Sequence, residues 1–278
     1  MSGERNREEM IESSSNSHIK KIQKLMKNAR FRRQEQAFVV EGWKMVSEAL
    51  ERRLVKAVYL SDCAYQEYRE RLAARELSVC EKDVAVETVS DQCFRLIADT
   101  VTPQGILAIV HMPEYDKNRI LSLPDSALLC LEDIQDPGNL GTMLRTAEGA
   151  GMSALVLSKG CVDIFNPKVV RSTMGALFRV PFFVCEDMST EVELLKREGF
   201  VTYAAHLGAE QNFMEEKYAR KTAVLIGNEA KGLSDGVSEK ADRLLKIPME
   251  GELESLNAAV SAALFMYEVY RRRKNVLQ

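Results

Sequence analysis

Short, strongly apolar segments that alternate with helical stretches constrain this chain most, because few folds bury such strands on both faces. In the C-terminal half the expected strands are Leu128–Leu131, Leu155–Leu157, Val180–Val184, Val201–Ala204, Ala223–Ile226 and Leu244–Ile247. Strands without a polar face are typical of a parallel sheet that is covered by helices on both sides. Ligands bind such sheets beyond the carboxyl ends of the strands, so the residues just after each strand are the candidates for a site.

The N-terminal half predicts a second, smaller α/β module. Strands are expected at 37–40, 55–60 and 105–110, with short apolar pieces at 77–79 and 84–89 and helices from 19, from 42, over 65–74 and over 92–98. Pro113, Pro124 and several charges then interrupt the pattern. We therefore expect a loose polar tail over 1–17, a first domain over 18–110, a linker over 111–126 and a second domain over 127–278.

Composition argues against several classes of protein. The chain has 278 residues, of which 46% are hydrophobic and 28% charged, as in a globular protein. Its polar start does not resemble a secretory signal, and no apolar stretch approaches the ~20 residues that span a bilayer. The six cysteines include no CxxC pair, so no metal site is expected. These features predict a cytoplasmic protein without membrane contact.

Positive charge is concentrated near the N-terminus, although the net charge of the whole chain is only −3. No acidic residue lies between His18 and Arg33, and the basic residues there are Lys20, Lys21, Lys24, Lys27, Arg30, Arg32 and Arg33. Ile19, Ile22 and Leu25 lie on the other side of the expected helix. A solvated helix face explains this pattern, and so does a surface that contacts phosphates.

The loop after Leu128–Leu131 contains the first polar group of interest. Asn139 follows Pro-Gly at a position where a helix N-cap is expected, and capping alone explains it. Arg145 lies two turns into the helix among apolar neighbours. A solvated arginine and a functional one both fit that position.

Two further loops follow later strands. Gly227, Asn228 and Glu229 come directly after Ala223–Ile226, where a glycine permits close approach of backbone or ligand. The loop matches neither GxGxxG nor the P-loop. After Leu244–Ile247, Ser255 is the expected N-cap of an alanine-rich helix over 258–263, whose first turn Asn257 could bond.

Together and in this order, the three segments resemble the signature motifs of one family. NLGTMLRTAEGAG, VLIGNEAKGLS and IPMEGELESLNAAVSAA are similar to the three motifs of the SpoU (TrmH-like) branch of the SPOUT RNA 2′-O-ribose methyltransferases. The resemblance covers residues 127–272 closely, and the first module resembles, less specifically, a ribosomal-protein-like α/β RNA-binding domain. It implies a mostly parallel α/β catalytic domain with a knotted C-terminal segment, and a homodimer formed through that domain.

The resemblance also implies the reaction, which is methylation of an RNA ribose 2′-hydroxyl by S-adenosylmethionine. By motif, the catalytic residues would be Asn139, Arg145, Glu229, Ser255 and Asn257. The residues expected around the cofactor are Ile226, Gly227, Asn228, Ile247, Met249 and Leu256. The basic residues of 18–33 would then contact RNA phosphates, which makes binding sensitive to salt.

The chemistry of arginine bears on the role of Arg145. A guanidinium stays protonated in nearly all protein settings, which makes it a poor base. We therefore expect Arg145 to hold the adjoining phosphate and to stabilise negative charge that develops on the 2′-oxygen. Glu229 is expected to orient Arg145 through a bidentate pair.

The sequence leaves the substrate open. Ribosomal RNA is favoured by the two-domain layout, while tRNA and a role in antibiotic resistance are alternatives. A different class of function is a catalytically inactive RNA-binding or ribosome-assembly factor with the same fold. The intact polar groups of the three motifs argue against that alternative. A nucleotide-dependent oxidoreductase is disfavoured because no GxGxxG follows a strand.

Overall fold

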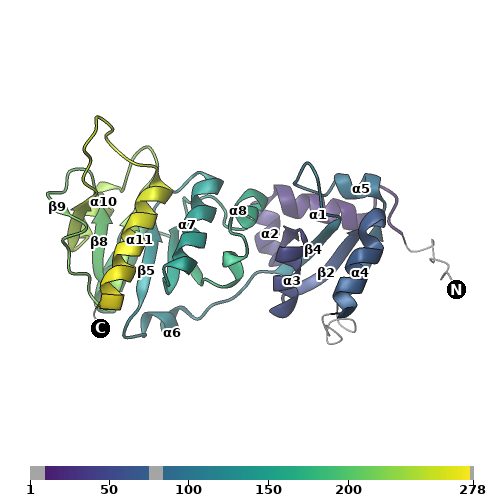
Figure 1. Ribbon diagram of the computed structural model, residues 1–278, viewed down its shortest axis with the longest axis horizontal. Coiled ribbons are helices and arrows are strands. Elements are labelled where there is room, and N and C mark those ends of the chain that lie inside the picture. Colours follow the sequence, from purple (N-terminus) through teal and green to yellow (C-terminus); the bar gives the residue numbers. More distant parts are fainter. Residues whose placement is uncertain (1–9, 75–83, 276–278) are drawn as a thin grey trace. The chain divides into compact units, whose positions relative to one another are not determined.

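The computed structural model describes residues 10–74 and 84–275, which fold into two compact units. The first unit is formed by Met1–Pro113 with Phe165–Phe178, and the second by Glu114–Ile164 with Arg179–Gln278. Residues 1–9 of the expected tail and the apolar piece at 77–79 lie outside the described residues. Figure 1 shows the chain coloured from the N-terminus to the C-terminus.

The division of the chain differs from the expected one in two places. Helix α6 (Lys117–Leu121) forms within the segment expected to be a linker, and Leu121 is buried in the core of the second unit. A segment from the C-terminal half, Phe165–Phe178, belongs to the first unit. There Phe165 and Phe178 contact the ring of Phe38, at centroid distances of 4.8 and 6.1 Å.

The first unit contains a four-stranded sheet with the strand order β1-β4-β2-β3. Its strands are β1 (Ala37–Glu41), β2 (Val55–Ser61), β3 (Ala85–Val89) and β4 (Ile106–His111). Its helices are α1 (Ser17–Lys27), α2 (Ala29–Glu35), α3 (Trp43–Glu51), α4 (Tyr65–Ala74), α5 (Asp91–Arg95) and α8 (Pro167–Ser172). Strand β4 pairs antiparallel with β1 and β2, while β2 and β3 are parallel.

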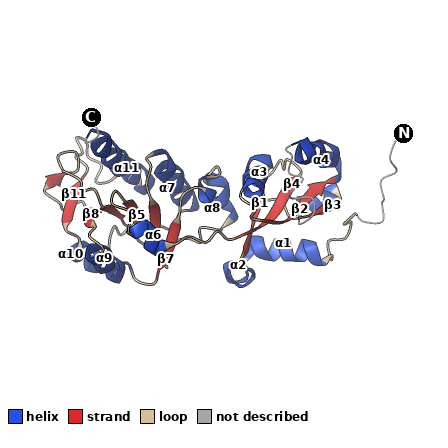
Figure 2. Ribbon diagram, turned by 90° about the horizontal axis from the view of Figure 1, so that it is seen from below, coloured by secondary structure: helices blue, strands red, loops and turns tan. Residues whose placement is uncertain are grey.

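Helix α1 forms because its apolar residues recur at helical spacing and find a core to cover. Ile19, Ile22 and Leu25 are fully buried, and they share a cluster with residues of β1, β4 and α5. Helices α3 and α4 lie on the other side of the sheet (Figure 2). Ile11 is also buried and bridges to Val89, so the segment expected to be a loose tail packs against the first unit at this residue.

The second unit contains a seven-stranded sheet with the order β7-β6-β5-β10-β8-β11-β9, in which every pair is parallel. The strands are β5 (Ala127–Leu131), β6 (Ala154–Ser158), β7 (Phe182–Cys185), β8 (Val201–Ala205), β9 (Gln211–Asn212), β10 (Thr222–Ile226) and β11 (Arg243–Lys246). The prediction of a parallel sheet is confirmed. Strands β5, β6 and β10 are buried at every position, as a sheet covered on both faces requires.

Helices cover both faces of this sheet. Helices α9 (Met188–Arg197) and α10 (Asp235–Lys240) pack against each other on one face, and α7 (Pro137–Gly149) and α11 (Ala258–Asn275) on the other (Figure 2). None of the helices in the described ranges is long and apolar enough to cross a membrane. The knotted path of the C-terminal segment stays a prediction.

Candidate active site

The first loop runs from β5 into α7, and its capping residue is not the expected one. The side chain of Asp136 accepts a hydrogen bond from the backbone N–H of Asn139 at 2.7 Å, and Pro137 occupies the first helical turn. Asp136 is therefore the N-cap, and the expectation that Asn139 caps the helix was wrong. Asn139 lies inside the first turn of α7, which leaves its side-chain amide available for contacts outside the helix.

Glu229 in the loop after β10 holds the start of α7. Its carboxylate accepts hydrogen bonds from the backbone N–H groups of Gln135 and Asp136, both at 3.1 Å, and from Nδ2 of Asn139 at 3.0 Å. Desolvation opposes ionisation of this carboxyl, but the donors outweigh it and hold the pKa of Glu229 below its ordinary value. The charged form of Glu229 is therefore part of the folded site.

Asn139 connects the second loop to the third. Its Oδ1 accepts a hydrogen bond from Nδ2 of Asn257 at 3.0 Å, while its Nδ2 donates to Glu229. The Oδ1 of Asn257 in turn accepts from the backbone N–H groups of Ala259 and Val260, so Asn257 caps α11. This helix begins at Ala258, and the expectation that Ser255 is its cap was wrong. The three loops are thus joined by one chain of side-chain hydrogen bonds, Glu229–Asn139–Asn257.

Arg145 lies apart from this chain. Its side chain is exposed on α7, and none of the described residues forms a hydrogen bond or ion pair with it. The expected bidentate pair with Glu229 does not form, because that carboxylate is occupied by Asn139 and two backbone N–H groups. A guanidinium in this setting can meet an anion from outside the chain.

Gly227 is required by the shape of its own loop. Asn228 and Gly232 exchange backbone hydrogen bonds of 3.0 and 2.9 Å, which folds the loop back onto Gly227. A Cβ at position 227 would lie 2.1 Å from the carbonyl carbon of Gly232 and from the backbone nitrogen of Leu233. The close approach that the sequence predicted therefore includes a contact of the backbone with itself.

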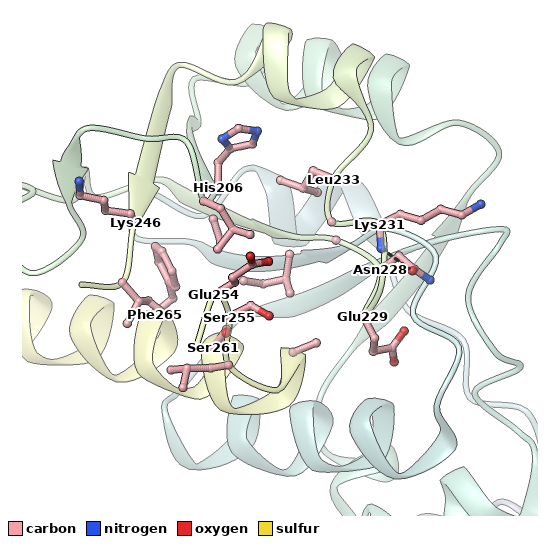
Figure 3. Close-up of a pocket in the computed structure, with 18 of the residues that line it drawn as sticks. His206, Asn228, Glu229, Lys231, Leu233, Lys246, Glu254, Ser255, Ser261 and Phe265 are labelled. Atoms are coloured by element: carbon pink, nitrogen blue, oxygen red, sulfur yellow. Dashed lines mark hydrogen bonds between the residues drawn. The ribbon is translucent and has the colours of Figure 1, made fainter. Parts of the chain in front are cut away.

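A cavity opens between this loop, the third loop and α11. All residues predicted to surround the cofactor line it, namely Ile226, Gly227, Asn228, Ile247, Met249 and Leu256. Ser255 and Glu229 line it as well, whereas Asn139, Arg145 and Asn257 do not. Figure 3 shows Glu229, Glu254 and Ser255 among the residues that line this cavity.

The cavity suits a ligand with an apolar ring and a charged polar end. Apolar walls come from Ile226, Ile247 and Phe265, while His206, Lys231 and Glu254 supply polar and charged groups. The donor set therefore fits S-adenosylmethionine, which combines adenine with an amino acid. Asn228 would contact it mainly through the backbone, because its side chain already bonds to Ala230, Lys231 and Asp133.

Two supporting residues were missed by the sequence reasoning. The carboxylate of Glu132 accepts hydrogen bonds from the backbone nitrogen and the hydroxyl of Ser234, at 2.7 and 2.8 Å, which ties the end of the Gly227 loop to β5. Gln135 bridges to the carbonyls of Asp133 and Gly160. The sequence signal that could have identified Glu132 is its position directly after a buried strand, where ligands bind parallel sheets.

The basic residues near the N-terminus divide into two groups. Exposed side chains are found at Lys20, Lys21, Lys24, Lys27, Arg30 and Arg33. Arg32 is different, because it is buried and its guanidinium donates to the carbonyls of Leu25 and Met26. Arg32 therefore supports the junction of α1 and α2, and a role in contacting phosphate does not suit it.

Comparisons with protein families match both halves of the chain. The model of the SpoU rRNA methylase family matches residues 126–267, and that of the MRM3-like substrate binding domain matches residues 16–108. The 23S rRNA (guanosine(2553)-2′-O)-methyltransferase RlmP of Bacillus subtilis is 35% identical over 260 residues, which is 93% of this chain and 98% of the relative. A tRNA/rRNA methyltransferase of Synechocystis that is described as uncharacterised is 31% identical over 95% of this chain and 94% of its own length.

Solved structures match over nearly the whole chain as well. The AdoMet-bound rRNA methyltransferase from Sinorhizobium meliloti aligns with a TM-score of 0.81 and 26% identity, over 94% of this chain and 97% of that one. The SpoU methyltransferase AviRb from Streptomyces viridochromogenes, in complex with AdoMet, aligns with a TM-score of 0.81 and 25% identity, over 94% and 100% of the two chains.

Proposed function

Because the chain belongs to the SpoU rRNA methylase family, we propose that it methylates a ribose 2′-hydroxyl of RNA with S-adenosylmethionine as the methyl donor. The observation that carries this proposal is the hydrogen-bonded chain Glu229–Asn139–Asn257 beside a cavity that fits the donor. Ribosomal RNA is the favoured substrate, since the similar RlmP is named for 23S rRNA. Such a substrate would place the protein in the cytoplasm.

The residues around the cavity would hold the cofactor, which supplies an activated methyl group on a sulfonium. Ile226, Ile247 and Leu256 would cover the adenine, and backbone groups around Gly227 would bind its edge. Ser255 lies on the cavity wall, where its hydroxyl can bond the ribose of the RNA or the cofactor. Positioning should dominate the catalysis, because the donor needs no further activation.

Arg145 would act on the RNA side. We assign it to the phosphate next to the reacting ribose, where its guanidinium also stabilises the negative charge that develops on the 2′-oxygen. The proton of the 2′-hydroxyl would pass to solvent water as the methyl group is transferred. Asn139 and Asn257 would position the ribose, and Glu229 would keep Asn139 and the start of α7 in place. In this scheme Glu229 is a positioning residue.

Methyl transfer itself tests the proposal. The purified protein is incubated with labelled S-adenosylmethionine and either a 23S rRNA transcript or bulk tRNA, and 2′-O-methyl positions are mapped. We expect modification of one nucleotide in the 23S transcript. Cofactor binding by calorimetry without methylation of either RNA would favour the inactive assembly factor. Failure to bind the cofactor would remove the enzyme proposal.

The exposed basic residues of α1 and α2 supply a prediction about salt. Replacing Lys27 and Arg30 by glutamine should weaken binding of the RNA transcript more at low salt than at high salt. If both residues contact phosphates, the slope of log K against log salt falls by about 0.7 to 0.9 for each. Filter binding across a salt series measures this slope.

The matched control replaces Arg197 and Lys217, which are exposed in the second unit, by glutamine. The same slope in both double variants would contradict the assignment. Deleting the helices instead is uninformative, because Ile19, Ile22 and Leu25 are part of the core.

We also propose that the protein forms a homodimer through α11. The exposed side of α11 is unusually apolar, with Val260, Leu264 and Tyr267 exposed by 48%, 39% and 50%, and a cavity beside them is lined by Thr142 of α7. Arg145 lies one turn after Thr142, so the reacting region and this apolar face share one side of α7.

We expect Leu264→Glu with Tyr267→Glu to convert a dimer to a monomer, because two charges would be buried without partners. Sedimentation velocity measures the mass of each species. Val184→Glu changes a residue that is 62% exposed in the same unit, and it should leave the dimer intact. A monomeric wild-type protein would contradict the proposal.

A further inference from the structure

We propose that a cavity in the first unit binds one unpaired nucleobase of the RNA. This inference rests on the proposed function, since it assumes that RNA is the substrate. The cavity has a volume of about 280 Å³ and lies between α1, α3, α8 and the loop that precedes β4. It is separate from the cofactor cavity, which is formed entirely by the second unit.

The walls of the cavity have the composition that a flat aromatic ring requires. Met26 of α1, Met45 of α3 and Val170 of α8 give apolar surface, and methionine adapts readily to the face of a ring. Thr100, Thr102 and Gln104 from the loop supply polar groups. The volume is near the lower end of the ~300–1,000 Å³ range of pockets for drug-sized ligands, which suits a single ring system.

Gln104 is held in an orientation that can read the edge of a base. Its Oε1 accepts a hydrogen bond from the backbone N–H of Trp43 at 2.8 Å, which fixes the amide and assigns the other end as Nε2. A Cβ on Gly42, which has a φ of +87°, would lie 3.1 Å from the same oxygen, so the two segments are closely fitted. The amide NH2 is then a placed donor for a keto oxygen or a ring nitrogen, as in guanine or uracil.

The acidic residues at the cavity are already neutralised or bonded. The carboxylate of Glu41 accepts from the backbone N–H of Asp99 at 2.7 Å and from the hydroxyl of Thr100. Asp99 itself forms an ion pair with Arg171. The charge of Asp99 is therefore paired with a cation, and the carboxylate of Glu41 is held by two neutral donors.

Exposed cations lie next to the cavity walls along the chain. Lys24 and Lys27 flank Met26, Lys44 precedes Met45, and Lys168 lies on α8 two residues before Val170. These side chains can hold the phosphates on either side of a base that enters the cavity. Unpaired bases with free edges are the usual targets of sequence-specific RNA recognition, and this combination of cations and an apolar slot favours such a base over a free metabolite.

The substitution Gln104→Glu tests the inference with little disturbance of the fold. Glutamate keeps an acceptor for the N–H of Trp43 but replaces the NH2 donor with a second acceptor. We expect the affinity for a 23S rRNA transcript to fall by at least about 10-fold, with cofactor affinity and melting temperature unchanged. Gln34→Glu is the matched control, because it adds the same charge at an exposed position of α2 outside the cavity.

Photocrosslinking gives a second measurement that needs no variant. Transcripts that contain 4-thiouridine or 6-thioguanosine should crosslink to peptides carrying Met45 or Thr102. Equal effects of the two glutamate substitutions, or crosslinks confined to peptides outside the cavity, would overturn the inference. If the wild-type protein still methylates the transcript in that case, the proposed function stands and only the nucleobase site falls. If the wild type neither binds nor methylates RNA, both fail.

Discussion

Replacing Arg145 by alanine is expected to lower the rate of methyl transfer by at least about 100-fold, the usual cost of removing one group that stabilises a developing oxyanion. The affinity for S-adenosylmethionine should not change, because Arg145 does not line the cofactor cavity. Single-turnover methylation and calorimetry measure the two quantities separately. The fold should be unaffected, since the side chain is exposed and unbonded among the described residues.

Two companion variants sharpen this test. Arg145→Lys keeps the charge but loses the planar fork, so an intermediate rate is expected if a phosphate is gripped by two hydrogen bonds. Arg197→Ala removes an exposed arginine from α9 of the same unit and should leave the rate unchanged. Equal loss of rate and cofactor affinity in Arg145→Ala would refute the role assigned to the guanidinium.

The substitution Glu229→Gln should have the second largest effect. Glutamine keeps one oxygen but must place its NH2 group opposite at least one donor, because all three partners of Glu229 donate hydrogen bonds. The start of α7 and the side chain of Asn139 would both shift. We expect kcat/KM to fall by roughly 10- to 100-fold, and a surface control, Glu210→Gln, to behave as wild type.

The pKa of Glu229 adds a dependence on pH to this prediction. The folded state holds that pKa below its ordinary value of 4.5. The stabilisation is therefore fully present above pH 4.5 and is lost as the pH falls through the lowered folded-state pKa. Thermal unfolding of the wild type, followed from pH 7 down to pH 3, should show this loss below pH 4.5. Glu229→Gln should lack that part of the acid dependence, and identical profiles would count against the role of the carboxylate.

Local patterns in the sequence predicted most of the elements but not how they are joined. The strands were found because buried parallel strands are apolar throughout, as in Leu128–Leu131. The placement of β10 beside β5 could not be predicted, because pairing between distant segments leaves no periodic signal in either one. The inclusion of Phe165–Phe178 in the first unit could not be predicted for the same reason, because it also depends on contacts between distant segments.

The site shows the same limit at the level of single residues. The sequence motifs identified Asn139, Glu229 and Asn257, which the structure joins by hydrogen bonds. The motifs did not show that Glu229 would bond to backbone N–H groups and form no pair with Arg145, because those contacts depend on how closely two loops approach each other. The burial of Arg32 was hidden for a similar reason, because its charge resembles that of its exposed neighbours.

The pairing of β5 with β10 also has a consequence for biosynthesis. A ribosome makes the chain from its N-terminus, so β5 and α7 emerge well before β10 and α11 exist. Until then one edge of β5 has no strand to pair with, and an open apolar edge of this kind invites aggregation. The sheet of the first unit, in contrast, is complete in sequence once β4 has emerged. A nascent chain would therefore complete the sheet of the first unit early and add α8 to it later. The capacity for chemistry would come last.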